Sequence, residues 1–261
     1  MNQQVMNQLA DYLSRAEQNR QGVKPLTKLV PDIQMKDAYQ VQLLIVQRKV
    51  ESGQKIVGKK IGLTSLAMQQ LLGVDQPDYG HLLDSMIIEN GRTLSLGQVI
   101  QPKVEAEIAF VLKSDLIGPN VTAEDVILAT DYIVPALEIV DSRIENWQIK
   151  LEDTVADNAS SSHFVLGGSP TQVDTLDLMQ FSATLMKNGE VMNKGVGADV
   201  LGGPALCVAW LANKLQEFGI TLSAGEVILS GALSAAVDVQ PGDYVQAVFD
   251  HIGEVSVRFG A

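Results

Sequence analysis

Cysteine is almost absent from this 261-residue chain, and so are long apolar runs. Cys207 stands alone, so no internal disulfide can form, which is typical of a protein from a reducing compartment. No window approaches the roughly 18 uninterrupted apolar residues of a membrane span. Residues 1–19 are polar and helix-like, without the apolar segment of a secretory signal. We therefore expect a cytoplasmic protein.

Basic residues are also scarce: 19 Lys and Arg stand against 31 Asp and Glu, which gives a net charge of −12. This acidity, without any long run of Lys or Arg, disfavours nucleic acid or an anionic membrane as a partner. An anionic small molecule would need a local cation in order to bind. The motifs of serine hydrolases and of nucleotide-binding glycine loops are missing, and His81, His163 and His251 show no metal-ligand spacing.

What remains is the composition of a large globular protein, because hydrophobic residues make up 46% of the chain. Residues 1–60 follow a helical pattern and are expected to form an N-terminal helical region packed on the core. Residues 61–261 alternate short apolar runs with Gly and Pro, which predicts a β domain. A short helix is predicted at residues 66–72, capped by Ser65, and the clearest helix is Ala205–Phe218. The predicted fold class is α+β, with a curled β core behind the N-terminal helices.

Two apolar runs contain glutamates that a buried strand would bring together. In Gln101–Leu112, alternation with period two places Glu105 and Glu107 on one face of a strand whose other face is fully apolar. Ile133–Val140 has Glu138 as its single charged residue. Buried carboxylates need a cation or a proton, and oxygen ligands of this kind suit Mg²⁺ or Mn²⁺. The alternative interpretation is an edge strand with two solvated glutamates.

Other polar residues are candidates on weaker grounds. Lys59 and Lys60 must point oppositely in a strand, so an inward Lys60 is a candidate base or anion clamp, unless it is a surface lysine on an edge strand. Asp78, in the sequence QPDYG, is expected on a loop, where it would approach a substrate or form a turn. Asp141 and Arg143 are expected to pair with each other, beside the site or as a structural pair at a strand end.

A polar segment, VADNASSS at residues 155–162, is the last candidate. It brings Asp157, Asn158, Ser160 and Ser161 into one short stretch after a helix. This density suits hydrogen bonds to a substrate, and it suits capping or turn roles equally well.

Several of these segments together resemble a known family. VGKKIGLTS, LLGVDQPDYG, QPKVEAEIAFVL, IVPALEIVDSR, DTVADNASS and ALCVAWLANKL are similar to the bacterial 2-hydroxypentadienoate (2-keto-4-pentenoate) hydratases. These enzymes belong to the fumarylacetoacetate hydrolase superfamily and act in the meta-cleavage degradation of aromatic compounds. The resemblance runs from about residue 5 to the C-terminus. It implies a β-roll or barrel-like catalytic core over residues 61–261, and a homo-oligomer that associates with neighbouring pathway enzymes.

The resemblance also implies the roles of individual residues. A divalent metal, Mg²⁺ or Mn²⁺, is expected on Glu105, Glu107 and Glu138. Lys60 and Asp78 are expected to line the reaction centre. Ser160 is expected near the substrate, with Ser161 beside it.

The implied reaction adds water to 2-hydroxypenta-2,4-dienoate and gives 4-hydroxy-2-oxopentanoate. The metal would stabilise an enolate, Lys60 or Asp78 would move a proton to C5, and Asp78 would activate water for C4. The 4-oxalocrotonate decarboxylases share the metal carboxylates and remain the alternative. NASSSHF and GALSAAVDVQPGD lean towards them, whereas QPDYG leans towards the hydratases. A non-catalytic binding protein that reuses the fold is a third interpretation.

Overall fold

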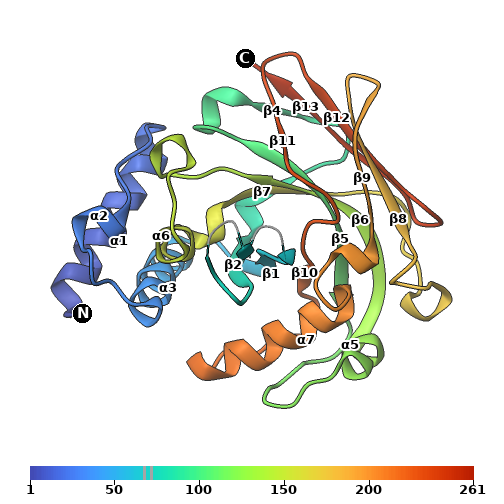
Figure 1. The fold of residues 1–261 in the computed structure, drawn as a ribbon, viewed down its shortest axis with the longest axis horizontal. Helices are drawn as coiled ribbons and strands as arrows, with labels where there is room; N and C mark the ends of the chain where they lie inside the picture. The colour runs from blue at the N-terminus through green and yellow to red at the C-terminus, as the bar shows by residue number, and fades with distance from the viewer. Residues whose placement is uncertain (67–68, 71–72) are drawn as a thin grey trace.

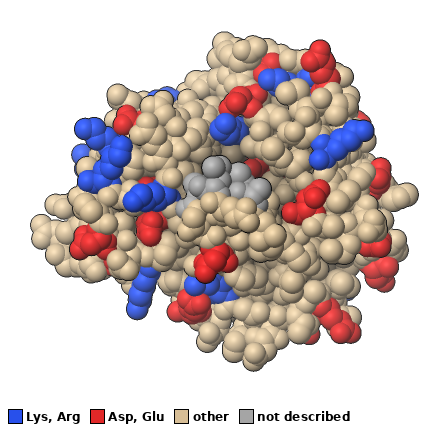
Figure 2. Space-filling view, in the orientation of Figure 1, with Lys and Arg blue, Asp and Glu red and all other residues tan. Residues whose placement is uncertain are grey.

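The computed structural model describes residues 1–66, 69–70 and 73–261. Two curled β-sheets form its centre, helices of the N-terminal region lie on one side, and further helices lie at another edge (Figure 1). The predicted α+β class, with curled sheets behind N-terminal helices, is confirmed. No described helix is long and apolar enough to cross a membrane. On the face shown in Figure 2, acidic and basic side chains are interspersed rather than gathered into one patch.

The N-terminal helices are α1 (Gln3–Asn19), α2 (Leu26–Leu29) and α3 (Met35–Glu51). Helix α1 begins where the side chain of Asn2 accepts a hydrogen bond from the N–H of Val5, and it ends at Arg20 in the left-handed conformation with φ 52°. Apolar residues at helical spacing, Leu9 and Leu13 among them, form its buried face. The region is therefore packed on the rest of the molecule through amphipathic helices.

The larger sheet has the strand order β2-β1-β10-β5-β6-β7-β3, and β11 also pairs with β5. Its strands are β1 (Ile56–Gly62), β2 (Asp78–Leu83), β3 (Ile87–Ile88), β5 (Lys103–Leu112), β6 (Thr130–Val140), β7 (Ser161–Leu166), β10 (Val227–Leu229) and β11 (Val237–Asp238). The apolar runs of β5 and β6 are buried along nearly their whole length, as expected for strands in the middle of a covered sheet. The predicted boundary between residues 60 and 61 falls inside β1.

The smaller sheet has the order β4-β13-β12-β8-β9. Its strands are β4 (Thr93–Ser95), β8 (Ser182–Lys187), β9 (Glu190–Val196), β12 (Tyr244–Phe249) and β13 (Gly253–Gly260). Strands β8 and β9 form a hairpin at Asn188-Gly189, and both turn residues have the positive φ of such turns, 53° and 84°.

The remaining helices are α5 (Ala123–Ala129), α6 (Leu151–Ala156) and α7 (Pro204–Leu215). Helix α5 has a side-chain cap, because the hydroxyl of Thr122 accepts from the N–H of Asp125. Helix α7 begins at Pro204, one residue before the predicted start, and a 3₁₀ turn, Gln216–Phe218, completes the predicted helical stretch. The helix predicted at residues 66–72 includes positions that lie outside the described residues.

Candidate active site

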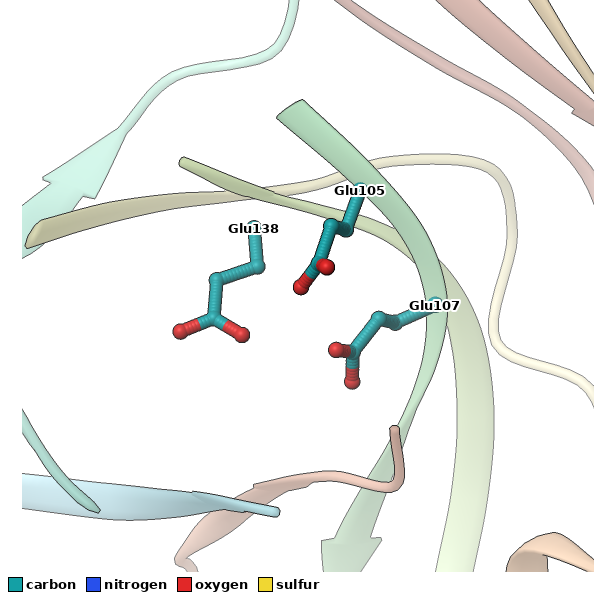
Figure 3. A group of neighbouring side chains, drawn as sticks. All are labelled: Glu105, Glu107 and Glu138. Carbon is teal, nitrogen blue, oxygen red and sulfur yellow. The ribbon is translucent and has the colours of Figure 1, made fainter. Parts of the chain in front are cut away.

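The three glutamates of the two apolar runs lie together on the larger sheet. Strands β5 and β6 are antiparallel, and their register places Glu105 directly opposite Glu138, while Glu107 follows two residues along the same face. One oxygen from each carboxylate lies within 4.8 Å of the other two. Figure 3 shows all three side chains pointing into one space. The period-two alternation of the sequence and the strand register together create this cluster.

The cluster has few internal partners for its negative charge. The N–H of Gly231 donates to Oε2 of Glu107 at 2.8 Å. Within the described part of the chain, the other Glu107 oxygen and both Glu138 oxygens are buried without a hydrogen-bond partner. Burial, the charge of Glu138 and the charge of the neighbouring glutamate raise the pKa of Glu107 well above its ordinary value. Burial likewise raises the pKa of Glu105 to about 7, against the opposing charge of Lys60. Three converging carboxylates, with orphaned oxygens on Glu107 and Glu138, fit a hard divalent cation such as Mg²⁺.

Lys60 extends from β1 into the same space. Its Nζ lies 3.2 Å from Oε2 of Glu138 and donates to the carbonyl of Ala159 at 3.2 Å. Burial opposes the charge of Lys60, but the carboxylates of Glu138 and Asp78 outweigh it and hold its pKa above the ordinary value. Lys59 points the other way and is also buried, paired with Glu226 at 2.5 Å. The interpretation of Lys60 as a surface lysine on an edge strand is therefore wrong.

Asp78 is the first residue of β2 rather than a loop residue, and it is buried. Its Oδ1 has no hydrogen-bond partner among residues 1–66, 69–70 and 73–261. Burial raises the pKa of Asp78 to about 6, although the charge of Lys60 acts in the opposite direction. Gly62 lies opposite Asp78 in the β1–β2 register. A Cβ placed on Gly62 would lie 2.2 Å from Asp78 Oδ1 and 3.2 Å from Lys60 Nζ, so both groups occupy the space above this glycine.

The two serines of the polar segment have different surroundings. Ser160 is buried, and its hydroxyl lies 3.2 Å from that of Thr154. Ser161 lines a cavity of about 20 Å³, together with Leu13 and Ile45 of the N-terminal helices. None of the three glutamates, Lys60 or Asp78 lines that cavity. The structure thus brings Lys60 and Asp78 to the glutamates and places Ser161 on another cavity.

The predicted ion pair between Asp141 and Arg143 is wrong. The guanidinium of Arg143 pairs with the carboxylate of Asp157, and it donates to the carbonyl, not the carboxylate, of Asp141. The Asp141 carboxylate instead accepts from the backbone N–H groups of Ile100 and Gln101. The carboxylates of Asp141 and Asp157 therefore each have partners distant in sequence, which the local pattern DSR does not reveal.

Two further groups lie near the site, one on Asn158, which the sequence analysis named as a candidate, and one on Ala159, which it missed. The carbonyl of Ala159 contacts Lys60, and the side chain of Asn158 binds the backbone of His81 on β2. The polar density of residues 155–162 was the available signal. Every residue has a backbone carbonyl, so the identity of residue 159 could not indicate that its carbonyl contacts Lys60.

Comparisons with known proteins agree with this geometry. The family model described as fumarylacetoacetate (FAA) hydrolase C-terminal matches residues 64–259. The 2-hydroxyhexa-2,4-dienoate hydratase of Comamonas testosteroni is 47% identical over 95% of this chain and 94% of its own length. The 2-keto-4-pentenoate hydratase of Paraburkholderia xenovorans (strain LB400) is 46% identical over 99% of this chain and 96% of its own length.

A solved structure is similar over the whole fold. It is 4-oxalocrotonate decarboxylase from Pseudomonas putida G7, complexed with magnesium and adipate. It superposes with a TM-score of 0.97 at 41% identity, covering 99% of this chain and 98% of the other. Fold, carboxylate cluster and sequence similarity all lead to one assignment: the chain belongs to the fumarylacetoacetate hydrolase family.

Proposed function

We propose that this protein is a metal-dependent hydratase that adds water to 2-hydroxypenta-2,4-dienoate and gives 4-hydroxy-2-oxopentanoate. The observation that carries the proposal is Asp78, a buried carboxylate with an unpaired oxygen beside the ammonium of Lys60. Hydration needs a base that can position and deprotonate water, and a carboxylate in this place can do both. The names of the two hydratases described above support the same reaction class.

Glu105, Glu107 and Glu138 would hold the divalent metal, which we propose to be Mg²⁺ or Mn²⁺. When bound, it supplies a Lewis acid for the 1-carboxylate and 2-oxygen of the substrate. It also supplies the local cation that a chain with a net charge of −12 needs in order to hold an anionic ligand.

Lys60 and Asp78 divide the proton transfers in this proposal. The ammonium of Lys60 gives a proton to C5 and takes one back from the 2-hydroxyl, whose oxygen becomes a ketone. The oxygen of water then bonds to C4, a water proton passes to the carboxylate of Asp78, and Asp78 returns a proton to C3. The pKa of Lys60 above its ordinary value keeps the amine protonated, and the pKa of Asp78 of about 6 leaves the carboxylate mostly ionised at neutral pH.

Decarboxylation of 4-oxalocrotonate is the second candidate, and the full-length likeness to a decarboxylase structure favours it. In that reaction no water adds at C4, and the negative charge of Asp78 would repel the distal carboxylate of a dicarboxylate substrate. Hydration therefore gives Asp78 a use that decarboxylation does not.

The deciding experiment offers the enzyme 2-hydroxypenta-2,4-dienoate and 4-oxalocrotonate in the presence of Mg²⁺ or Mn²⁺. Products are followed by mass and by CO₂ release. We expect water addition to the first substrate. Rapid CO₂ release from the second, with no hydration of the first, would assign the protein to the decarboxylases, and turnover of neither would favour a binding role.

Asp78→Asn tests the role of the carboxylate. We expect kcat to fall by roughly 10²-fold or more, the usual range for losing a general acid or base, while metal affinity stays the same. Asp75→Asn makes the same change on an exposed loop three residues earlier and serves as the control. Equal activities of the two variants would contradict the assignment.

The assembly is a further part of the proposal. We propose a homo-oligomer, on the basis of the family resemblance, and light scattering at micromolar concentration tests it. A monomer mass would contradict this part and would leave the reaction untouched.

A further inference from the structure

Between α6 and β7 the chain makes a left-handed turn, Asn158–Ser160. Three successive residues other than glycine have positive φ there: 53°, 50° and 55°. This conformation is unfavourable for residues with a Cβ, and it persists only where surrounding contacts impose it. Asn visits it more readily than Ala or Ser. The contacts that hold the turn therefore indicate what it positions.

The side chain of Asn158 fastens the turn to β2. Its Oδ1 accepts from the N–H of His81 at 2.8 Å, and its Nδ2 donates to the carbonyl of His81 at 2.9 Å. Strand β2 is an edge strand, so the amide replaces the missing neighbour strand at this residue. The backbones also approach closely, because a Cβ on Gly80 would lie 2.4 Å from the carbonyl oxygen of Asn158. The turn thus lies against the strand that carries Asp78.

The next residue of the turn presents its carbonyl to the site. Ala159 accepts from Lys60 Nζ at 3.2 Å, on an ammonium that also lies 3.2 Å from Glu138. The four-carbon chain of a lysine side chain is flexible and does not by itself fix the position of the ammonium group. The carbonyl therefore fixes where the ammonium points.

The far end of the turn is held independently. The carbonyl of Ser160 accepts from the N–H of Asp141 at 2.7 Å, and Asp157, just before the turn, pairs with Arg143. These contacts tie the turn to the end of β6. With one end on β6 and the other on β2, the turn spans the two sides of the site.

We propose that Asn158 is a positioning residue for Lys60. Its amide seats the turn against β2, so that the Ala159 carbonyl holds the ammonium beside Glu138 at the reaction centre. The inference rests on the proposed function in one respect, the role of Lys60 as proton donor. Asn158 acts through Lys60 and does not itself contact the reacting atoms.

The test compares Asn158→Gly with Asn188→Gly. Glycine accepts the positive φ of either position, so each variant removes the side-chain amide and keeps the turn. Asn188 is a close match, because it has the same φ of 53° and its amide also makes two hydrogen bonds, to Asp243 and Tyr244 in the other sheet. We expect Asn158→Gly to lower kcat by roughly 30- to 100-fold, in keeping with a misplaced reacting group. KM and Mn²⁺ affinity should change little. Asn188→Gly should lose less thermal stability, because Asn188 is exposed and Asn158 is buried, and it should keep its kcat.

A double-mutant cycle separates positioning from general damage. Because Asn158 acts through Lys60, adding Asn158→Gly to Lys60→Met should slow the enzyme no further. Additive losses, or equal losses in the two glycine variants, would overturn the proposal. The cycle is run on whichever of the two substrates the wild-type enzyme converts.

A crystal structure of Asn158→Gly gives a readout that needs no activity. We expect Lys60 Nζ to move beyond hydrogen-bond distance, about 3.5 Å, from the Ala159 carbonyl. If the wild-type enzyme converts neither substrate, the proposed function fails and this distance alone decides the positioning role. An unmoved ammonium would overturn it.

Discussion

Gly62→Ala adds one methyl group next to Asp78 and Lys60, the two residues that we propose to transfer protons. Directly opposed residues of an antiparallel pair have their Cβ atoms on the same face, and Gly62 is opposed to Asp78. Lys60 lies two residues earlier on that face. The new Cβ would lie 2.2 Å from Asp78 Oδ1 and 3.2 Å from Lys60 Nζ. Gly62 does not have a positive φ, so the substitution acts through this contact and not through backbone strain.

The size of the effect follows from the contact distance. Non-bonded heavy atoms separate to about 3.5 Å, so the Asp78 carboxylate must move by about 1 Å to accommodate the methyl group. A displacement of this size in a reacting group costs on the order of 10²-fold in rate. We therefore expect Gly62→Ala to lower kcat by about 10²-fold, and to lower the free energy of unfolding by about 1–3 kcal/mol through overpacking.

The assay measures hydration of 2-hydroxypenta-2,4-dienoate and titrates Mn²⁺ by calorimetry. The metal affinity should stay near that of the wild type, because the three glutamates are on β5 and β6. Gly97→Ala is the control, since Gly97 is exposed, lacks a positive φ and would meet only the hydroxyl of Ser95, at 3.3 Å. A kcat within threefold of the wild-type value would refute the placement of Asp78 in the reaction.

Three further predictions follow from other contacts. Glu107→Gln removes the charge of a proposed metal ligand and should weaken Mn²⁺ binding by roughly tenfold or more, which unchanged affinity in a calorimetric titration would contradict. Gln42→Leu removes the amide that hydrogen-bonds the carbonyls of Tyr79 and Val155 and the ring of His81. These three buried groups are then left without that partner. Urea unfolding should show a loss of more than about 2 kcal/mol, against about 0.5 kcal/mol or less for Gln47→Leu on the exposed face of the same helix. Burial, with a smaller effect of the charge of Lys59, lowers the pKa of His81 to about 3. Between pH 6.5 and this value, His81 therefore binds a proton in the unfolded chain but not in the folded protein. Stability should then fall with decreasing pH by up to about 1.4 kcal/mol per pH unit, and an equal slope in His81→Gln would be evidence against it.

The carboxylate cluster could be predicted because its signal is local. Glu105 and Glu107 differ by one strand period, and Glu138 is the single charge in the next apolar run. Adjacent antiparallel strands then need only the right register to bring them together, and the register is set by the apolar faces. Chemistry and geometry here come from the same short segments.

The position of Lys60 could not be decided in the same way. A strand must point one of two successive lysines inward, but β1 lies between β2 and β10, so both Lys59 and Lys60 are buried. The second burial is possible because Glu226, distant in sequence, neutralises Lys59. No pattern around residue 60 contains that partner. The same holds for Arg143, which takes the carboxylate of Asp157 over the nearer Asp141.

The turn at Asn158–Ser160 was beyond sequence reasoning for a different reason. Ala159 and Ser160 do not favour the left-handed conformation, so their identity argues against the backbone that they adopt. The turn is imposed by tertiary contacts, of which the Asn158 amide and the Ser160 carbonyl are two. Departures from local preference of this kind are expected where function constrains the chain.

The curl of the larger sheet completes the site. In the strand order, β10 and β5 separate β1 from β6. Neighbouring strands lie about 4.8 Å apart, so in a flat sheet the backbones of β1 and β6 would be roughly 14 Å apart. Yet Lys60 Nζ lies 3.2 Å from Glu138, and the carboxylates point across the concave side (Figure 3). Curvature therefore sets the distance between β5 and β6, which carry the three glutamates, and β1 and β2, which carry Lys60 and Asp78. Because the two pairs are separate elements, substitutions in the first should change metal affinity and those in the second should change kcat, and only a change in the curl should alter both together.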